Sequence, residues 1–508
     1  MSATMSDHRY ARVLYAIALG LAGNLGAQIP SWNVDTFQAP PDARWAPITA
    51  RDVDAAYVLL RDNHPGAATE AHDVDFQHRL AEGHRLALER ARTVTSYQGY
   101  LFVLAGFATA MGDKHIWSRP TFVVNMPRWP RIMVSKRGDT WVVTDADPPQ
   151  VPLVGAVLVS CDGQGVEALA RKNIGGFRAN WDIGAQQAQF APWLLVDEGN
   201  PFIARLKACA FDANGQRQTI TLDWVRIKRE TLLPRLAKAG GAGHSGYGVR
   251  QVGNGYWIAL QDMSSLRATD VVKAVEQQKE VLRSAPFVVL DVRGNRGGSS
   301  LMGREIAASL FGAPYVDARF RSTASECAGP DGAWRVSQGN INQLEYMLHT
   351  ADFVREGGPE IRQMVETTLH NLGDARAHGR AFSGPTHCPD TAAGPEGAAA
   401  PPSEMKGHLV LLTDNLCFSA CLSLTDDFRT LGAFHIGQTT DAATRYVDVR
   451  EQYLPSGYSL FSTLQSLDPS SPAQVGPFRP ALTYNGDIDD TATLEKWVVD
   501  SAVPAASR

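Results

Sequence analysis

The sequence has no excess of positive charge, no late hydrophobic run and no unusual richness in glycine or proline, and each absence excludes a class of protein. Its 508 residues hold 48 Lys and Arg against 53 Asp and Glu, a formal net charge of −5, whereas nucleic-acid-binding proteins normally carry a basic face. Beyond Pro30, no apolar run reaches the ~20 residues that a membrane-spanning helix needs. The 45 Gly and 29 Pro are ordinary for this length, which excludes collagen-like and wholly disordered chains. We therefore expect a globular chain of roughly three domains.

The N-terminal segment has the pattern of a secretory signal peptide. Arg9 and Arg12 precede an apolar run over residues 13–23, and the small residues Gly26 and Ala27 follow it. This pattern predicts a signal peptide over residues 1–27, a mature chain that begins near Gln28, no membrane span after cleavage, and a periplasmic or secreted location. An uncleaved anchor and an ordinary N-terminal helix are the alternatives.

Six cysteines are present: Cys161, Cys209, Cys327, Cys388, Cys417 and Cys421. The first two and the middle two each fall within one expected domain, and the last two are four residues apart, as neighbours on a helix face would be. Two interpretations remain open, namely disulfides or free buried thiols. The spacing of these cysteines and of His370, His378 and His387 does not follow zinc-ligand patterns, so no metal site is predicted.

Three parts of different character follow the signal segment. Helical periodicity predicts an N-terminal helical domain over residues 28–120. Short β-branched runs with turn residues predict a β-rich domain over residues 125–226, with an atypical insertion at roughly 172–203. Continuous apolar strands alternate with helices over residues 245–508, which predicts an α/β core whose sheet is covered on both faces. Residues 318–405 look inserted into this core, and we expect them to form a cap.

Two strand ends carry residues suited to chemistry. The first is the segment Asp291-Val292-Arg293-Gly294-Asn295-Arg296-Gly297-Gly298, where a buried strand enters a glycine-rich turn. Successive N–H groups at such a turn can bind an anion, either a phosphate or the oxyanion of a reaction intermediate. The nucleotide-binding patterns GxGxxG and GxxxxGK[ST] are absent.

The second strand end leads to Ser419, which we expect at the start of a helix. Unpaired N–H groups and the positive end of the helix dipole would stabilise negative charge beside its hydroxyl. From the local pattern, Ser419 is either an N-cap or a nucleophile.

The order of these parts resembles the C-terminal processing (tail-specific) protease family. The "D-x-R-x-N-x-G-G" segment of the family is similar to residues 291–298, its "x-S-A" nucleophile segment to Ser419 and Ala420, and its later "G-x-x-T" to residues 437–440. Residues 154–164 resemble the strand and Asp-Gly turn of a PDZ domain. The resemblance implies a crotonase-like (Clp-protease-like) α/β core, a PDZ-like domain, a Ser419 nucleophile and an oxyanion hole formed by the backbone of Gly297 or Gly298 and Ala420.

The family contains Ser–Lys and Ser–His designs, and the sequence favours the second. No lysine lies between Lys406 and Lys496, where the Ser–Lys branch carries its base, and Arg445 stays protonated. The tricorn-like branch, which is related to retinoid-binding repeats, implies His115 as the base, since histidine titrates near neutrality.

The residues around Ser419 and His115 leave alternatives open. The group that orients His115 is left open among Asp113, Asp441 and Glu451. Cys417 is a weaker rival nucleophile. If residues 112–116 are extended, the side chain of Lys114 points away from His115, and removing it should cost little activity.

The sequence thus predicts an exported serine endopeptidase that acts on peptides or polypeptides through an acyl-enzyme. It predicts no cofactor and no nucleic-acid partner. Two alternatives stay open: a catalytically silent peptide- or lipid-binding protein on the same fold, and a hydrolase of small esters or amides.

Overall fold

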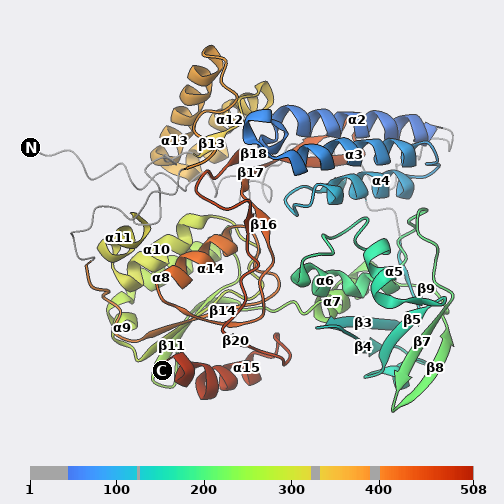
Figure 1. Ribbon diagram of the computed structural model, residues 1–508. Helices are drawn as coiled ribbons and strands as arrows, with labels where there is room; N and C mark the ends of the chain where they lie inside the picture. The colour runs from blue at the N-terminus through green and yellow to red at the C-terminus, as the bar shows by residue number, and fades with distance from the viewer. Residues whose placement is uncertain (1–43, 123–125, 322–331, 389–400, 507–508) are drawn as a thin grey trace, which may run out of the picture.

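A computed structural model of the chain describes residues 44–122, 126–321, 332–388 and 401–506. The architecture is mixed α/β with several separate sheets, as Figure 1 shows. The predicted signal peptide and the start of the mature chain lie outside the described residues. Within the described ranges, no helix is both long and apolar enough to cross a membrane.

A six-stranded sheet forms the centre of the α/β core. Its order is β10 (Tyr247–Val252), β11 (Gly255–Leu260), β12 (Phe287–Asp291), β14 (His408–Thr413), β15 (Phe434–Gly437) and β20 (Leu482–Thr483). All neighbours run parallel except β10 and β11, which are antiparallel. Every residue of β12 is buried, because successive side chains enter two different hydrophobic clusters on the two faces. The predicted α/β character of this part is confirmed.

Helices cover both faces of this sheet. On one face lie α8 (Leu266–Gln277), α9 (Lys279–Ser284), α10 (Ser300–Phe311), α11 (Ala313–Arg321) and α14 (Ala420–Thr430). On the other face lies α15 (Thr491–Trp497), whose Leu494 packs with Val289 and Leu412. Because β12 and β14 are parallel neighbours, their carboxyl ends lie at the same edge of the sheet, where the turns of residues 291–298 and 414–419 begin.

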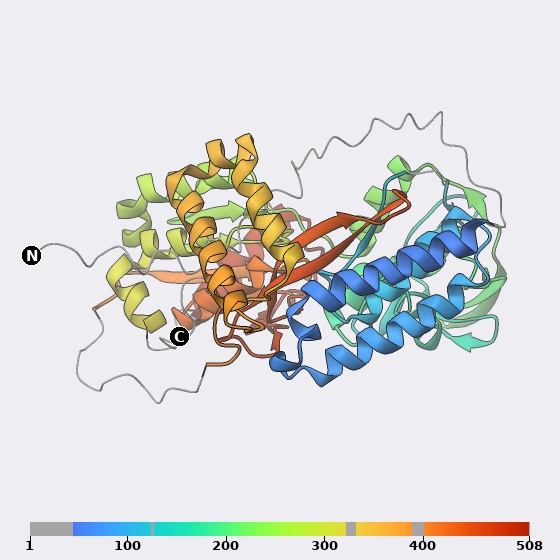
Figure 2. The ribbon, with the colours of Figure 1, turned by 90° about the horizontal axis from the view of Figure 1, so that it is seen from above.

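The N-terminal helices share their core with a hairpin from far along the chain. They are α2 (Trp45–Asn63), α3 (Val74–Ala91) and α4 (Tyr97–Ala110), and they pack on β17 (Tyr446–Tyr453) and β18 (Ser459–Leu467). Phe107 stacks on Phe461 with ring centroids 5.7 Å apart. Figure 2 shows the long hairpin lying beside these helices. The helices that the sequence placed in one N-terminal domain thus depend on residues 446–467 for burial.

The β-rich domain contains a sheet in the order β3 (Ile132–Arg137), β4 (Thr140–Ala146), β5 (Val157–Cys161), β7 (Ala208–Ala213) and β8 (Gln216–Thr221). Cys161 and Cys209 face each other across β5 and β7 and form a disulfide. Of the two interpretations of these cysteines, the disulfide is therefore the one found. The atypical insertion contains the short helix α6 (Gly184–Phe190). This helix contacts the α/β core, where Gln186 hydrogen-bonds to Asp441.

The inserted segment is anchored at its base and protrudes as a helical hairpin. Strand β13 (Ala333–Trp334) pairs with β18, and α12 (Gln338–His349) and α13 (Ala351–Ala377) follow. Phe382, beyond the hairpin, belongs to the hydrophobic core of the N-terminal helices. The base of the insertion is thus part of the surrounding structure. Cys327 lies outside the described residues, so its pairing with Cys388 stays a prediction.

Candidate active site

Ser419 lies in the turn between β14 and α14, at the N-cap position. Its backbone has φ 58° and ψ −130°, a conformation that residues other than glycine rarely adopt. The side chain makes no capping hydrogen bond, so the N-cap alternative does not describe Ser419. The hydroxyl instead lines a cleft that also contains His115. Strained backbone of this kind costs about 1–3 kcal/mol and is typical of functional residues.

A disulfide joins the two cysteines that bracket Ser419. Cys417 and Cys421 are bonded to each other, with Cα atoms 5.3 Å apart, and neither side chain is exposed. Cys417 therefore has no thiolate to offer, and the rival assignment of Cys417 as nucleophile is wrong for this structure. The disulfide encloses the serine in a short covalent loop.

Asp113 orients His115. The carboxylate Oδ1 accepts hydrogen bonds from His115 Nδ1 at 2.9 Å and from the His115 backbone N–H at 2.8 Å. Its Oδ2 accepts from the Thr444 N–H at 3.1 Å and from the Thr444 hydroxyl. Because Asp113 accepts at Nδ1, the proton sits there and Nε2 is left as an acceptor. Both side chains are almost fully buried, at 6% and 1% exposure.

The electrostatics of Asp113 keep it charged. Burial raises the pKa of the carboxyl, but the nearby His115 and the hydrogen bonds from His115 and Thr444 lower it more, so the pKa lies below its ordinary value. Of the other two candidates for orienting His115, Asp441 binds Lys114. Glu451 accepts hydrogen bonds from Trp117 and Arg119.

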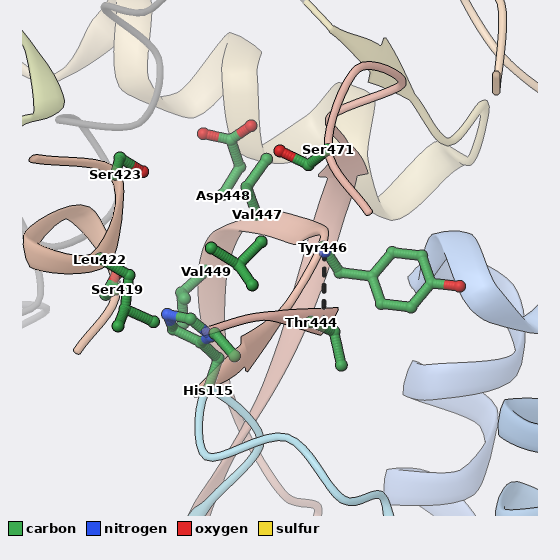
Figure 3. Close-up of a pocket in the computed structure, with 12 residues that line it drawn as sticks. His115, Ser419, Leu422, Ser423, Thr444, Tyr446, Val447, Asp448, Val449 and Ser471 are labelled. Carbon is green, nitrogen blue, oxygen red and sulfur yellow. Dashed lines mark hydrogen bonds between the residues drawn. The ribbon is translucent and has the colours of Figure 1, made fainter. Parts of the chain in front are cut away.

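His115 and Ser419 lie side by side at one end of the cleft, as Figure 3 shows. The ring of Phe418 lies 4.4 Å from the His115 ring, centroid to centroid, so the residue before the serine packs directly on the histidine. Among the described residues, no hydrogen bond joins the two candidates, an arrangement common in ligand-free enzymes, in which such bonds tighten when substrate binds.

The glycine turn after β12 packs against Ser419. A Cβ added to Gly297 would lie 2.8 Å from Ser419 Cβ, so only glycine fits there. The N–H of Gly297 donates to Asn295 Oδ1 at 2.8 Å, which disfavours Gly297 among the two glycines that the prediction left open. The N–H groups of Gly298 and Ala420 have no acceptor within the described residues. These two N–H groups lie beside Ser419 without an acceptor in the described chain, as donors to an anion would.

The remaining residues of the "D-x-R-x-N-x-G-G" segment hold the turn rather than face the cleft. Asp291 and Arg293 form a fully buried ion pair, with Nη2 and Oδ2 2.7 Å apart. Asn295 donates its amide to the Leu260 carbonyl at 2.9 Å and accepts the Phe418 N–H at its own carbonyl. The segment thus links the turn of residues 294–298 (the oxyanion turn) to the neighbouring strand and to the turn of residues 414–419 that holds Ser419 (the nucleophile turn).

Asp414, which the sequence analysis did not identify, hydrogen-bonds to three separate segments of the backbone. Its carboxylate accepts the N–H groups of Gly243, Gly294 and Leu416 at 3.0, 2.9 and 3.0 Å. Burial raises the pKa of Asp414 to about 6, although the three N–H donors oppose this shift. An aspartate directly after a buried strand and at the first position of the nucleophile turn was a signal that could have identified it.

Lys114 does not lie as predicted. The segment that holds it forms a turn, with the Ile116 N–H donating to the Asp113 carbonyl, so the extended geometry is wrong. Its Nζ donates to Asp441 Oδ2 at 2.6 Å and lies 4.6 Å from the centre of the Phe418 ring. Burial lowers the pKa of the amine, and the Asp441 carboxylate opposes this shift. Lys114 therefore faces the nucleophile turn.

The cleft beyond the two candidates is lined by polar and apolar side chains in similar measure. Its walls come from α14, β17 and the short strands β16 (Ala443–Thr444) and β19 (Gln474–Val475). The lining residues besides Ser419 and His115 are Leu422, Ser423, Ala443, Thr444, Tyr446, Val447, Asp448, Val449, Ser471 and Val475. Within the described parts of the chain, no three His, Cys, Asp or Glu side chains are placed to hold a metal ion.

Comparison with known proteins assigns the core to a class. The model of peptidase family S41 matches residues 255–467, which include the oxyanion turn and Ser419. The protein is thus a serine-type peptidase, a hydrolase. Residues 255–467 are thus similar to peptidase family S41, and the predicted resemblance to C-terminal processing proteases is confirmed. No curated protein matches the sequence significantly.

Two solved structures of mature CPAF share the fold over about nine-tenths of this chain. The crystal structure of mature CPAF superimposes with a TM-score of 0.56 at 14% identity, over 91% of this chain and 98% of that chain. Mature CPAF complexed with lactacystin gives a TM-score of 0.53 at 13% identity, over 90% and 99%. The photosystem II D1 C-terminal processing protease gives 0.33 at 11% identity, over 86% and 93%.

Proposed function

We propose that the protein is an exported serine endopeptidase of the tail-specific type that cleaves peptides or polypeptides through an acyl-enzyme. Ser419 Oγ attacks the scissile carbonyl carbon while His115 Nε2 accepts its proton, and the histidine then returns that proton to the leaving amine. The N–H groups of Gly298 and Ala420 stabilise the oxyanion. Water repeats the sequence on the acyl-enzyme and releases the second product. These steps need no cofactor.

The observation that carries this proposal is the hydrogen-bonded Asp113–His115 pair beside an uncapped serine in a left-handed turn. A buried carboxylate that fixes the histidine tautomer supports His115 as the general base, because Nε2 then presents its lone pair. Lys114 is a poor alternative base, because its amine is paired with Asp441 at 2.6 Å.

The family branch and the architecture form part of the same proposal. The mainly parallel core sheet supports a crotonase-like core, and the strand, Asp-Gly turn and helix over residues 157–173 support a PDZ-like domain. A histidine supplied from the part before the β-rich domain supports the tricorn-like, Ser–His design.

Export is proposed on two grounds. The first is the signal-like N-terminal sequence. The second is the presence of disulfides in two different parts of the chain, which form and persist chiefly outside the cytosol. N-terminal sequencing of the protein from its host is the test, and a soluble cytosolic pool with Met1 intact would contradict export.

A fluorophosphonate probe tests the catalytic proposal, because it labels only an activated serine. We expect labelling of the purified protein at Ser419, located by peptide mass spectrometry, and none in the Ser419→Ala variant. Ser423→Ala is the matched control, since Ser423 lines the same cleft and should be dispensable. Failure of the wild-type protein to react would favour a catalytically silent binding protein. Labelling with turnover of esters but no peptides would favour the small-substrate hydrolase.

A further inference from the structure

A network of hydrogen bonds and ring contacts connects the turn that holds Ser419 to the loop that holds His115. The ring of Phe418, the residue before the serine, contacts two side chains of the His115 loop. His115 packs on this ring, and Lys114 Nζ lies 4.6 Å from its centre, a cation–π distance. Two consecutive residues of the His115 loop thus contact the same aromatic ring.

Asp441 connects the lysine to the same turn. Its Oδ2 accepts from Lys114 Nζ at 2.6 Å, and its backbone N–H donates to the Cys417 carbonyl at 3.1 Å. The Asp441 side chain is fully buried, whereas that of Lys114 retains 18% exposure. A buried carboxylate needs its partner, so loss of the lysine charge would leave Asp441 uncompensated beside the nucleophile turn.

Two glutamines of α6 complete the network from the β-rich domain. Gln186 Nε2 donates to Asp441 Oδ1 at 2.9 Å, and Gln189 Oε1 accepts from Lys114 Nζ at 3.1 Å. The Gln189 amide also donates to the Asn415 carbonyl, at the start of the nucleophile turn. The insertion in the β-rich domain therefore contacts the His115 loop and the Ser419 turn together.

We propose that Lys114, Asp441 and Gln189 are positioning residues that hold the Phe418–Ser419 turn against His115, and that α6 makes this alignment depend on docking of the β-rich domain. This inference rests on the proposed catalytic roles of Ser419 and His115. The network acts on geometry: it touches the residues flanking the serine and the histidine, but not the atoms that exchange the proton. Its loss should therefore lower the rate of acylation rather than substrate binding, since small misplacements of reacting groups can cost about 10²-fold in rate.

The test compares Lys114→Met, Lys114→Arg and Gln189→Leu in the full-length protein, with peptide turnover and fluorophosphonate labelling as readouts. Lys114→Met should lower kcat by about 10²-fold with KM changed by less than about threefold. Lys114→Arg, which keeps the charge, the ion pair and the ring contact, should recover most of that loss. Gln189→Leu should lower kcat by roughly tenfold, and it decides the matter if Lys114→Met fails to fold.

Lys136→Met is the matched control. Lys136 also pairs with an acid, Glu167 at 3.1 Å, and lies over an aromatic ring, Trp141 at 5.8 Å, but within the β-rich domain. It should leave kcat unchanged. Folded Lys114→Met or Gln189→Leu protein that labels and turns over at the wild-type rate would overturn the inference. Wild-type protein that is never labelled would instead overturn the proposed function, so the two failures are distinct.

Discussion

A left-handed backbone at a serine persists only where its surroundings impose it, and the residues around Ser419 show how this is done. The disulfide fixes Cys417 to Cys421, the Phe418 N–H donates to the Asn295 carbonyl, and Gly297 leaves no space on the opposite side. A covalent bond, a hydrogen bond and close packing thus act on the same turn.

The disulfide should matter for activity as well as for stability. Replacing Cys417 and Cys421 together by alanine frees the turn to relax, so we expect the fluorophosphonate labelling rate to fall by about 10–10²-fold. The Cys161→Ala/Cys209→Ala variant removes the other described disulfide, in the β-rich domain, and is the control. Equal labelling of both folded variants would show that the Cys417–Cys421 bond does not align Ser419.

Asp113 should be needed for the rate of catalysis. Asp113→Asn can present a donor to His115 Nδ1, which would shift the ring proton to Nε2 and remove the acceptor that Ser419 needs. We expect kcat to fall by on the order of 10²–10⁴-fold. Glu451→Gln, at another candidate that binds Trp117 and Arg119 instead, should retain kcat. Comparable losses in the two variants would refute the assignment of Asp113.

Asp414 should make stability depend on pH. Its folded-state pKa of about 6 lies above the ordinary value of 3.8, so the folded protein binds the proton more tightly than the unfolded chain does. The resulting stabilisation is complete below about pH 4 and is lost as the pH rises through about 6. Relative to Asp414→Asn, the wild type should lose up to about 3 kcal/mol between pH 4 and 7. Thermal unfolding at several pH values measures this, and a constant difference would contradict it.

At the scale of elements, the hairpin α12–α13 is the part that can be altered with least damage to its surroundings. Its base cannot be removed, because β13 pairs with β18 and Asn340 donates to the Asn63 carbonyl in α2. A deletion of the whole insertion would therefore open the core beneath the N-terminal helices.

The cap hypothesis is tested by a shorter deletion. Replacing residues 346–366 with a short linker keeps Asn340, Leu372 and Phe382, which pack at the base of the hairpin. If the hairpin restricts access to the cleft, the trimmed protein should remain folded and cleave a wider set of peptides, as mass spectrometry of a peptide mixture would show. An unchanged set of cleavage products would mean that the hairpin is not a cap.

At the scale of the whole molecule, the sequence predicted the positions of individual elements, but not the contacts between elements that are far apart along the chain. The sequence predicted that buried strands lead into residues 291–298 and into the turn before Ser419, as β12 and β14 do, because burial on both faces leaves a continuous apolar run. The sequence could not show that the N-terminal helices bury their apolar faces on the β17–β18 hairpin.

The same limit applies to the active site. Motif similarity singled out Ser419 and His115, but it could not choose Asp113 over Asp441, since the choice depends on the turn at residues 113–116 and on Thr444 across the cleft. The direction of Lys114 was mispredicted for the same reason. The links from α6 depend on how two domains meet, which no local pattern encodes.

The central claim is that Ser419 and His115 act as one unit, and a double-mutant cycle on peptide turnover tests it most directly. Residues that carry out the same proton transfer are strongly non-additive, because losing either one disables the step. We predict that Ser419→Ala and His115→Ala each lower kcat by on the order of 10⁴-fold or more, and that the double variant is hardly worse than either single variant. Losses that multiply in the double variant, or a His115→Ala protein that retains substantial turnover, would contradict the account.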